Sequence, residues 1–267
     1  MKRNSSHGFI ELYVASSFDW RGLSIVYVFQ NSVSWMDTAK DARILVLEDA
    51  LRRLNDIVGN RKLKFHVEYS KLVGILQQVG SLVYEVKYSY VNAEQVADLD
   101  STKKIVENIG TFRKLIEQSI KSAGYKPATP KETHTQAELF YCFRIIERFQ
   151  YKLQHYDDDP AHAVDILVVE ISQTKPVQDS KNLTECRCTD GSRIWKILTN
   201  IHGLKMGTKL ACAVLPPVEM MNIISEAMFL GGTPLPESTE LGILESPDSS
   251  ILDQARAQVL VITKRMT

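Results

Sequence analysis

The stretch "YSKLVGILQQVGSLVYEVKYSY", residues 69–90, decides the N-terminal half of the fold. Its apolar and tyrosine residues recur at alternating steps of three and four: Tyr69, Leu72, Leu76, Val79, Val83, Val86 and Tyr90. This spacing puts them on one face of a helix, and three heptads in register are typical of a long helix packed at a shallow angle against another. Valine is common in strands, but the alternation of a half-buried strand is absent. We therefore predict a helix within residues 62–91.

The preceding segment, residues 37–58, carries the same pattern. Asp37 can cap it, Gly59-Asn60 can end it, and its apolar stripe consists of Ile44, Leu47, Leu51, Leu54 and Val58. Because only a short connection separates the two segments, we expect 44–58 and 69–90 to pack as antiparallel helices with their stripes facing each other.

Two further helices are predicted before the sequence changes character. Asp100-Ser101 can cap a helix that ends at Gly124, and another helix is expected over 135–155, after a proline-containing connector at 126–134. The segment 9–36 is ambiguous, because its β-branched and aromatic residues fit two helices or two strands.

The pattern changes after Ala163. Short runs rich in β-branched residues follow, separated by Gly, Pro, Asn and Asp: "VDILVVEIS", "LTECRC", "RIWKILT", "KLACAVL" and "QVLVITK". Such runs over about 100 residues favour a small closed barrel. The acidic triplet Asp157-Asp158-Asp159 before Pro160 disfavours a continuing helix, which places a domain boundary there. The predicted fold is α+β with two domains, a helical bundle at 1–160 and a β-barrel at 161–267.

Composition argues against several classes of function. With 32 Lys and Arg against 32 Asp and Glu, the whole chain gives no sign of a polyanion partner. The four cysteines include no Cys-x-x-Cys pair and are too few for a structural zinc site, which indicates reduced thiols. We see no phosphate-binding glycine loop, nucleophile elbow or His-Glu-x-x-His motif, so we expect no catalytic residues, no metal and no cofactor. No apolar run approaches the roughly 18 residues of a membrane span, and we expect a cytoplasmic protein.

Residues 164–267 carry five landmarks of a known family. They are the strand 164–172, the turn Lys175-Pro176-Val177-Gln178-Asp179 with Leu183, the segment 197–201, the short helical turn expected at 203–207 before Thr208-Lys209, and the segment 214–232. In order and spacing they resemble the OB-fold tRNA-binding domain of methionyl-tRNA synthetases and of free-standing dimeric tRNA-binding proteins. The resemblance covers about two-fifths of the chain. It implies an OB-fold barrel and a tRNA ligand.

The last landmark departs from the family's pattern in its charges. The matching positions are Leu215, Pro217, Met220, Ser225, Glu226, Met228 and Leu230. The positions where the family has lysine or arginine hold Pro216, Val218, Glu219 and Met221. Phosphate contacts supply most of the sequence-independent affinity for nucleic acid. Cations elsewhere on the domain must therefore supply any contacts to RNA.

Candidate RNA-binding residues lie on neighbouring predicted strands, in the loop above them and in the last landmark: Lys175, Lys181, Arg187, Arg193, Trp195, Lys196, Ser225 and Met228. OB barrels bind nucleic acid across one face with cations and aromatic side chains. Trp195 can stack on a base or pack inside the barrel, and Ser225 can contact a base edge or fix its own loop. A second basic cluster at a helix end is either an RNA-facing patch or a solvated face: Arg52, Arg53, Arg61, Lys62 and Lys64.

Large apolar residues stand where the family mostly shows cations and loop residues: Val218, Met220, Met221, Ile223 and Ile224. An exposed patch of this size marks an interface, so we expect this loop to lie against the chain's own helical domain, a second copy or another protein. The resulting hypothesis is a non-catalytic, tRNA-binding accessory protein of translation. Its expected partners are tRNA or other RNA, an aminoacyl-tRNA synthetase or another translation protein, and a second copy in a homodimer, with no membrane. The alternative is a protein-interaction or dimerisation module on an OB fold that has lost its RNA-binding cations.

Overall fold

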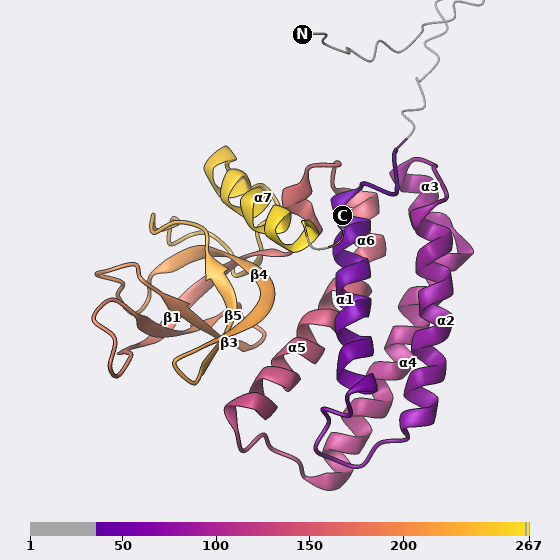
Figure 1. Ribbon diagram of the computed structural model, residues 1–267. Helices are drawn as coiled ribbons and strands as arrows, with labels where there is room; N and C mark the ends of the chain where they lie inside the picture. Colours follow the sequence, from indigo (N-terminus) through magenta and orange to yellow (C-terminus); the bar gives the residue numbers. More distant parts are fainter. Residues whose placement is uncertain (1–35, 265, 267) are drawn as a thin grey trace, which may run out of the picture. The chain divides into compact units, whose positions relative to one another are not determined.

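The chain is α+β. A computed structural model describes residues 36–264 and 266, so the ambiguous segment 9–35 lies outside the described residues. Helices α1 to α6 come first, between Ala42 and His155, and an antiparallel sheet follows them (Figure 1).

Helices α1 (Ala42–Gly59) and α2 (Tyr69–Lys87) confirm the two helices that the heptad spacing predicts. The apolar stripes of both are buried in one shared core. The Lys87 ammonium at the end of α2 lies 2.7 Å from the carboxylate of Glu48, near the start of α1. The two helices therefore run antiparallel, as predicted (Figure 1).

The starts of two helices differ from the prediction. Asp41 rather than Asp37 caps α1, because its side chain accepts a hydrogen bond from the Arg43 N–H. A short helix α3 (Ala93–Asp98), which the sequence analysis does not predict, precedes α4 (Asp100–Ala123), so Asp100 begins a helix and does not cap it. A carboxylate in the first turn still favours that helix through the positive end of its dipole.

The proline-containing connector is shorter than predicted. Helix α5 (Pro130–Glu147) begins inside it, because Thr129 accepts a hydrogen bond from the Glu132 N–H and proline suits the first helical position. The helix is interrupted at Arg148 and continues as α6 (Phe149–His155).

The sheet has the strand order β3-β2-β1-β4-β5, with a short β6 paired to β1. The strand pairs within residues 36–264 are antiparallel, and the strands are β1 (Ile166–Pro176), β2 (Thr184–Thr189), β3 (Ile194–Thr199), β4 (Lys209–Met220), β5 (Ile223–Phe229) and β6 (Gly242–Ile243). The two edge strands β3 and β5 are bridged by side chains. Ser225 Oγ accepts a hydrogen bond from the Leu198 N–H at 3.0 Å, and the Glu226 carboxylate accepts one from the Lys196 N–H at 3.3 Å.

Three predictions for this half of the chain are wrong. The run "QVLVITK" belongs to helix α7 (Ser249–Thr263) and is not a strand, because Ile251, Ala255, Val259 and Ile262 recur at helical spacing and are buried. The segment 214–232 is a hairpin of β4 and β5, not a loop, and its tight turn has φ of 52° at Met221 and 62° at Asn222. The segment 203–207 forms turns without a helix.

The helical region and the sheet share a continuous core, and charged side chains join them. The carboxylate of Asp165, just before β1, lies 2.5 Å from Arg144, 3.1 Å from Arg148 and 3.0 Å from Lys152. Asp165 and Lys152 are fully buried, with 2% of each side chain exposed. Burial raises the pKa of Asp165, but the charges of Lys152 and the two arginines outweigh it and hold that pKa at about 2.

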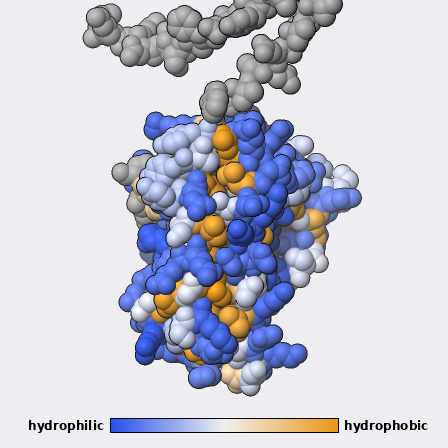
Figure 2. Space-filling model, turned by 90° about the vertical axis from the view of Figure 1, so that its right-hand side faces the viewer, coloured by the Kyte–Doolittle hydropathy of each residue, from blue (hydrophilic) through white to orange (hydrophobic). Residues whose placement is uncertain are grey.

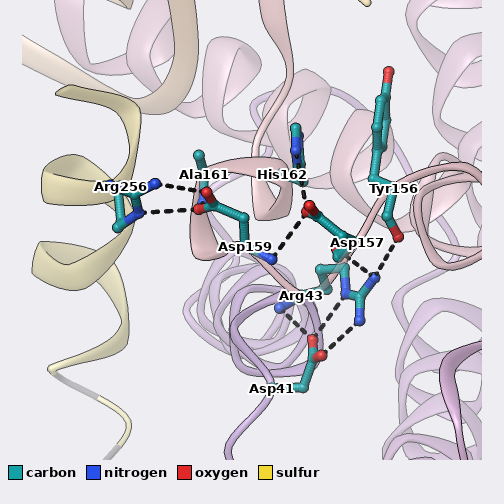
Figure 3. A network of polar contacts seen from close by, with 8 residues as sticks. All are labelled: Asp41, Arg43, Tyr156, Asp157, Asp159, Ala161, His162 and Arg256. Atoms are coloured by element: carbon teal, nitrogen blue, oxygen red, sulfur yellow. Dashed lines mark hydrogen bonds and ion pairs between the residues drawn. The ribbon is translucent and has the colours of Figure 1, made fainter. Parts of the chain in front are cut away.

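A second polar network holds the connection between the helices and the sheet (Figure 3). Arg43 is buried, pairs with Asp41, and donates to the carbonyl oxygens of Tyr156 and Asp157 after α6. The 3-10 helix η1 (Pro160–Ala163) follows, and α7 packs against it. Two hydrogen bonds join the guanidinium of Arg256 on α7 to the Asp159 carboxylate that caps η1 (Figure 3).

The surface on the side of α2 and α3 is mostly hydrophilic, with hydrophobic side chains in separate patches (Figure 2). Within residues 36–264, no helix is both long and apolar enough to span a membrane. The four cysteines are free and buried.

Candidate functional site

The outer side of β1, β2 and β3 carries three of the predicted cations. We call Lys175, Arg187 and Lys196 the basic face. Strand alternation explains the arrangement, because Cys186, Cys188 and Trp195 point into the core while the residues between them point outward. Arg187 stands opposite Lys196 on β3 and opposite Gln173 on β1, so one line of polar side chains crosses three strands.

The basic face has little internal compensation for its charge. Arg187 and Lys196 are direct cross-strand neighbours, and like charges in that position destabilise a sheet. Glu185 stands opposite Lys175, yet within residues 36–264 neither it nor any other carboxylate forms an ion pair with the three cations. Lys181 is exposed in the loop that joins β1 to β2 and is likewise without an ion pair among the described residues. An anionic ligand would relieve this repulsion.

Arg193 and Trp195 are used by the fold. The guanidinium of Arg193 lies 3.9 Å from the centre of the Trp195 ring and forms an ion pair with Glu226. Only 2% of Trp195 is exposed, and its indole N–H donates to Asp190 at 2.8 Å. Burial raises the pKa of Asp190, but hydrogen bonds from the Arg193 N–H, Trp195 and Ser192 outweigh it and lower that pKa. Of the two alternatives for Trp195, the structure therefore shows the ring packed inside and not free to stack on a base.

Ser225 and Met228 lie on β5, which adjoins β3 but is not one of the three strands of the basic face. The hydroxyl of Ser225 accepts from the Leu198 N–H and donates to the Ala227 carbonyl oxygen at 3.0 Å. The first bond joins β5 to β3 and the second lies within β5, so the hydroxyl of Ser225 fixes its own segment rather than pointing to a ligand. Met228 is half-buried opposite Ala213.

A groove of about 470 Å³ adjoins the basic face, between α4 and α5 on one side and β3 and β5 on the other. It is lined by Arg113, Thr133, Gln136, Ala137, Phe140, Arg193, Lys196, Ile224 and Glu226. Lys196 belongs to both the groove and the basic face. The groove could not be predicted from the sequence, because its two walls are separated in the chain by some 50 residues or more.

The predicted interface segment is divided by the hairpin. Ile224 is buried and shares the groove with α5, and the Pro217 carbonyl oxygen lies 3.0 Å from His134 Nε2 on that helix. Ile223 is half-buried. The remaining residues stay exposed near the turn: Val218 at 52%, Met220 at 44% and Met221 at 45%. We call these three residues the hairpin tip.

The second basic cluster is largely used in ion pairs within the helical region. Arg52 and Arg53 both pair with the buried Asp49, and Arg53 also pairs with Glu138 at 2.8 Å. Lys62 pairs with Asp56. These contacts favour the interpretation of this cluster as a helix-end surface over that of an RNA-facing patch.

The described residues offer no candidate for a metal site. Residues 36–264 contain no group of three His, Cys, Asp or Glu side chains placed to hold a metal ion.

A family model described as an alpha helical domain matches residues 35–155, a range that includes α1 to α6 and stops before the sheet. No curated protein matches the chain.

Proposed function

We propose that the sheet closes between β3 and β5 into a five-stranded barrel of the OB type. Two observations support this proposal. The strand order places β3 and β5 at opposite ends of the sheet, and Ser225 and Glu226 nevertheless bond to the backbone of β3. OB-type barrels bind oligonucleotides on the face of their second and third strands. The basic face lies on those strands and on β1.

On this barrel we propose a non-catalytic RNA-binding protein, and more narrowly a tRNA-binding accessory protein of translation. The observation that carries the proposal is the charge of the basic face, which no carboxylate within residues 36–264 neutralises and where Arg187 and Lys196 are cross-strand neighbours. The landmarks of residues 164–267 support tRNA as the RNA, through their resemblance to the tRNA-binding domain family.

The expected strength of this contact follows from counting cations. If the basic face and Lys181 each neutralise one phosphate, about four counterions are released, and the slope of log affinity against log salt is about −2.8 for a single strand. The affinity should then fall about 50-fold between about 50 and 200 mM salt. This salt dependence is modest and agrees with a chain of zero net charge.

A gel shift with total tRNA at two salt concentrations tests the proposal. The double variant Arg187→Glu/Lys196→Glu removes two contacts and adds two repulsive charges, so the shift should be lost at either salt concentration. The matched control is Lys104→Glu/Lys121→Glu on α4, which makes the same change in net charge at two exposed lysines outside the basic face. An equal loss of binding in both variants, or an undiminished shift in the first, would remove the RNA site from the basic face.

The exposed hairpin tip favours a second candidate function, a protein-interaction or dimerisation module. Three large apolar side chains at 44–52% exposure stand together at one turn, and methionine suits adaptable contacts. If two copies associate through the hairpin tip, Val218→Lys/Met220→Lys should convert a dimer to a monomer in sedimentation analysis. A wild-type chain that is monomeric at all concentrations would exclude the homodimer.

A further inference from the structure

We propose that the groove between the helical region and the sheet binds one nucleotide of a single-stranded RNA whose neighbouring phosphates lie on the basic face. The inference rests on the proposed function and deepens it. It assigns α4 and α5 a direct part in RNA binding, which neither the sequence pattern nor the family match provides.

One face of α5 forms the helical wall of the groove. Thr133, Gln136, Ala137 and Phe140 are spaced at steps of three, one and three, so their side chains follow one side of the helix. Ala137, Phe140 and Ile224 make an apolar floor, and Phe140 is only partly buried there. An aromatic ring beside an apolar floor suits the flat face of a base.

Polar groups stand at the edge of this floor. Gln136 can donate and accept hydrogen bonds, and Thr133, whose hydroxyl donates to the Thr129 carbonyl oxygen at 3.0 Å, can accept one from the edge of a base. Every base has both a stacking face and a polar edge, so the groove can accept a nucleotide without a strong preference for one base.

Cations outnumber carboxylates among the residues that line the groove. Arg113, Arg193 and Lys196 face one carboxylate, that of Glu226, which Arg193 already neutralises. Arg113 uses its Nε and Nη1 in ion pairs with Glu117 and Glu147, at 2.7 and 2.8 Å. Lys196 is therefore the cation best able to bind a phosphate, and it stands where the groove meets the basic face.

The size and form of the groove favour a single strand over a duplex. A volume of about 470 Å³ lies within the roughly 300–1,000 Å³ typical of small-ligand sites. In a duplex the bases are stacked and paired, whereas unpaired bases can be turned out onto aromatic side chains. An RNA single strand that crosses β2 and β3 along the basic face reaches the groove at Lys196.

Binding of two labelled RNAs, measured by fluorescence anisotropy, tests the inference: a single-stranded 12-mer of uridine and a 16-base-pair duplex. Phe140→Leu keeps an apolar side chain in the core but removes the ring, and it should weaken binding of the 12-mer about fivefold or more. Phe140→Tyr keeps the ring and should retain the affinity. Gln136→Glu places a negative charge in the groove and should also weaken the 12-mer. Its matched control is Gln77→Glu on the exposed side of α2, which should change nothing. The duplex should respond to none of the four.

The outcomes separate this inference from the function on which it rests. A 12-mer that binds Phe140→Leu and Gln136→Glu as tightly as the wild type overturns the groove and leaves the basic face standing. An equal loss of affinity for the 12-mer and for the duplex also overturns it, because the groove would then not distinguish single-stranded from double-stranded RNA. If the wild-type protein binds neither RNA, the proposed function fails and the groove fails with it. Melting temperatures of all variants within a few degrees of the wild type show that each comparison is made between folded proteins.

Discussion

Replacing Asp165 with asparagine should be among the most destabilising single changes in this chain. The carboxylate is buried and accepts from three cations, and one of these, Lys152, is itself fully buried. Asparagine keeps the shape but removes the charge, which leaves the ammonium of Lys152 without a counter-ion. The neutral acceptors that remain, the Ala163 carbonyl oxygen at 3.0 Å and the amide oxygen of the asparagine, do not balance its charge.

The magnitude follows from the exposure of the three cations. Arg144 and Arg148 have 26% and 27% of their side chains exposed, so water offsets much of their loss and each contributes about 0–1 kcal/mol. Breaking a buried pair by removing one partner costs about 3–5 kcal/mol. We expect Asp165→Asn to lower the free energy of unfolding by about 3–5 kcal/mol, which moves the urea midpoint by about 1–2 M at a slope near 2–3 kcal/mol/M.

A double-mutant cycle in urea identifies the cause. Lys152→Met in the Asp165→Asn background removes the unpaired buried charge and should restore about 1–2 kcal/mol. Asp98→Asn is the matched control, because 74% of that side chain is exposed and its ion-pair distance is 3.9 Å. The reasoning is wrong if Asp165→Asn costs less than about 0.5 kcal/mol, the range of ordinary surface changes.

The same carboxylate gives the fold an acid sensitivity with a defined sign. Its folded pKa of about 2 is below the value of about 3.9 in an unfolded chain. The stabilisation is therefore complete above pH of about 4 and is lost as the pH falls toward about 2, on the order of 2–3 kcal/mol in all. In Asp165→Asn the decline of stability between these pH values should be smaller by that amount.

Three further changes test other parts of the structure by urea unfolding. Arg43→Met removes the buried donor to two backbone carbonyls after α6 and should lower the free energy of unfolding by about 3–5 kcal/mol. A decrease under about 1 kcal/mol would contradict a stabilising role for this network (Figure 3). Met221→Asn with Asn222→Gly supplies the residues that a turn with two positive φ angles prefers, and should add about 0.5–1 kcal/mol; a decrease would contradict the turn geometry. Ser225→Ala leaves the Leu198 N–H without its partner and should cost about 1 kcal/mol; unchanged stability with weaker RNA binding would return Ser225 to the RNA site.

Local periodicity predicted the helices well and their ends poorly. The stripe of α2 repeats over three heptads, so no short-range alternative competes with a helix. The run "QVLVITK" misleads because seven residues taken alone fit a strand. The helical signal lies upstream, where Asp248 caps α7 by accepting from the Ile251 N–H at 2.8 Å. Thr129 before Pro130 is a similar start signal that marks α5 within its apparent connector.

The contacts that join the two halves could not be predicted from one sequence. Arg43 contacts the carbonyl oxygen of Tyr156 across 113 residues. Asp165 contacts cations 13 to 21 residues away, on α5, on α6 and at the break between them, and no sequence pattern fixes the rotation of these helices. The basic face was accessible to prediction, because strand alternation alone places Arg187 and Lys196 outward. The sequence could not show which of the predicted cations form ion pairs, because Arg193 and its partner Glu226 are 33 residues apart.

The Ser-Glu pair at 225–226 has a role in the fold that does not depend on a ligand. Both side chains reach across to the backbone of β3, where they bond the N–H groups of Leu198 and Lys196, and Glu226 also neutralises Arg193 above the buried Trp195. These contacts stabilise the junction of the two edge strands whether or not a ligand is bound. Residues 216–221, by contrast, form the outer part of a hairpin whose tip is exposed. Under the proposed function the contacts to RNA come from the basic face and not from this hairpin, so replacement of Arg187 and Lys196 is the change that tests it.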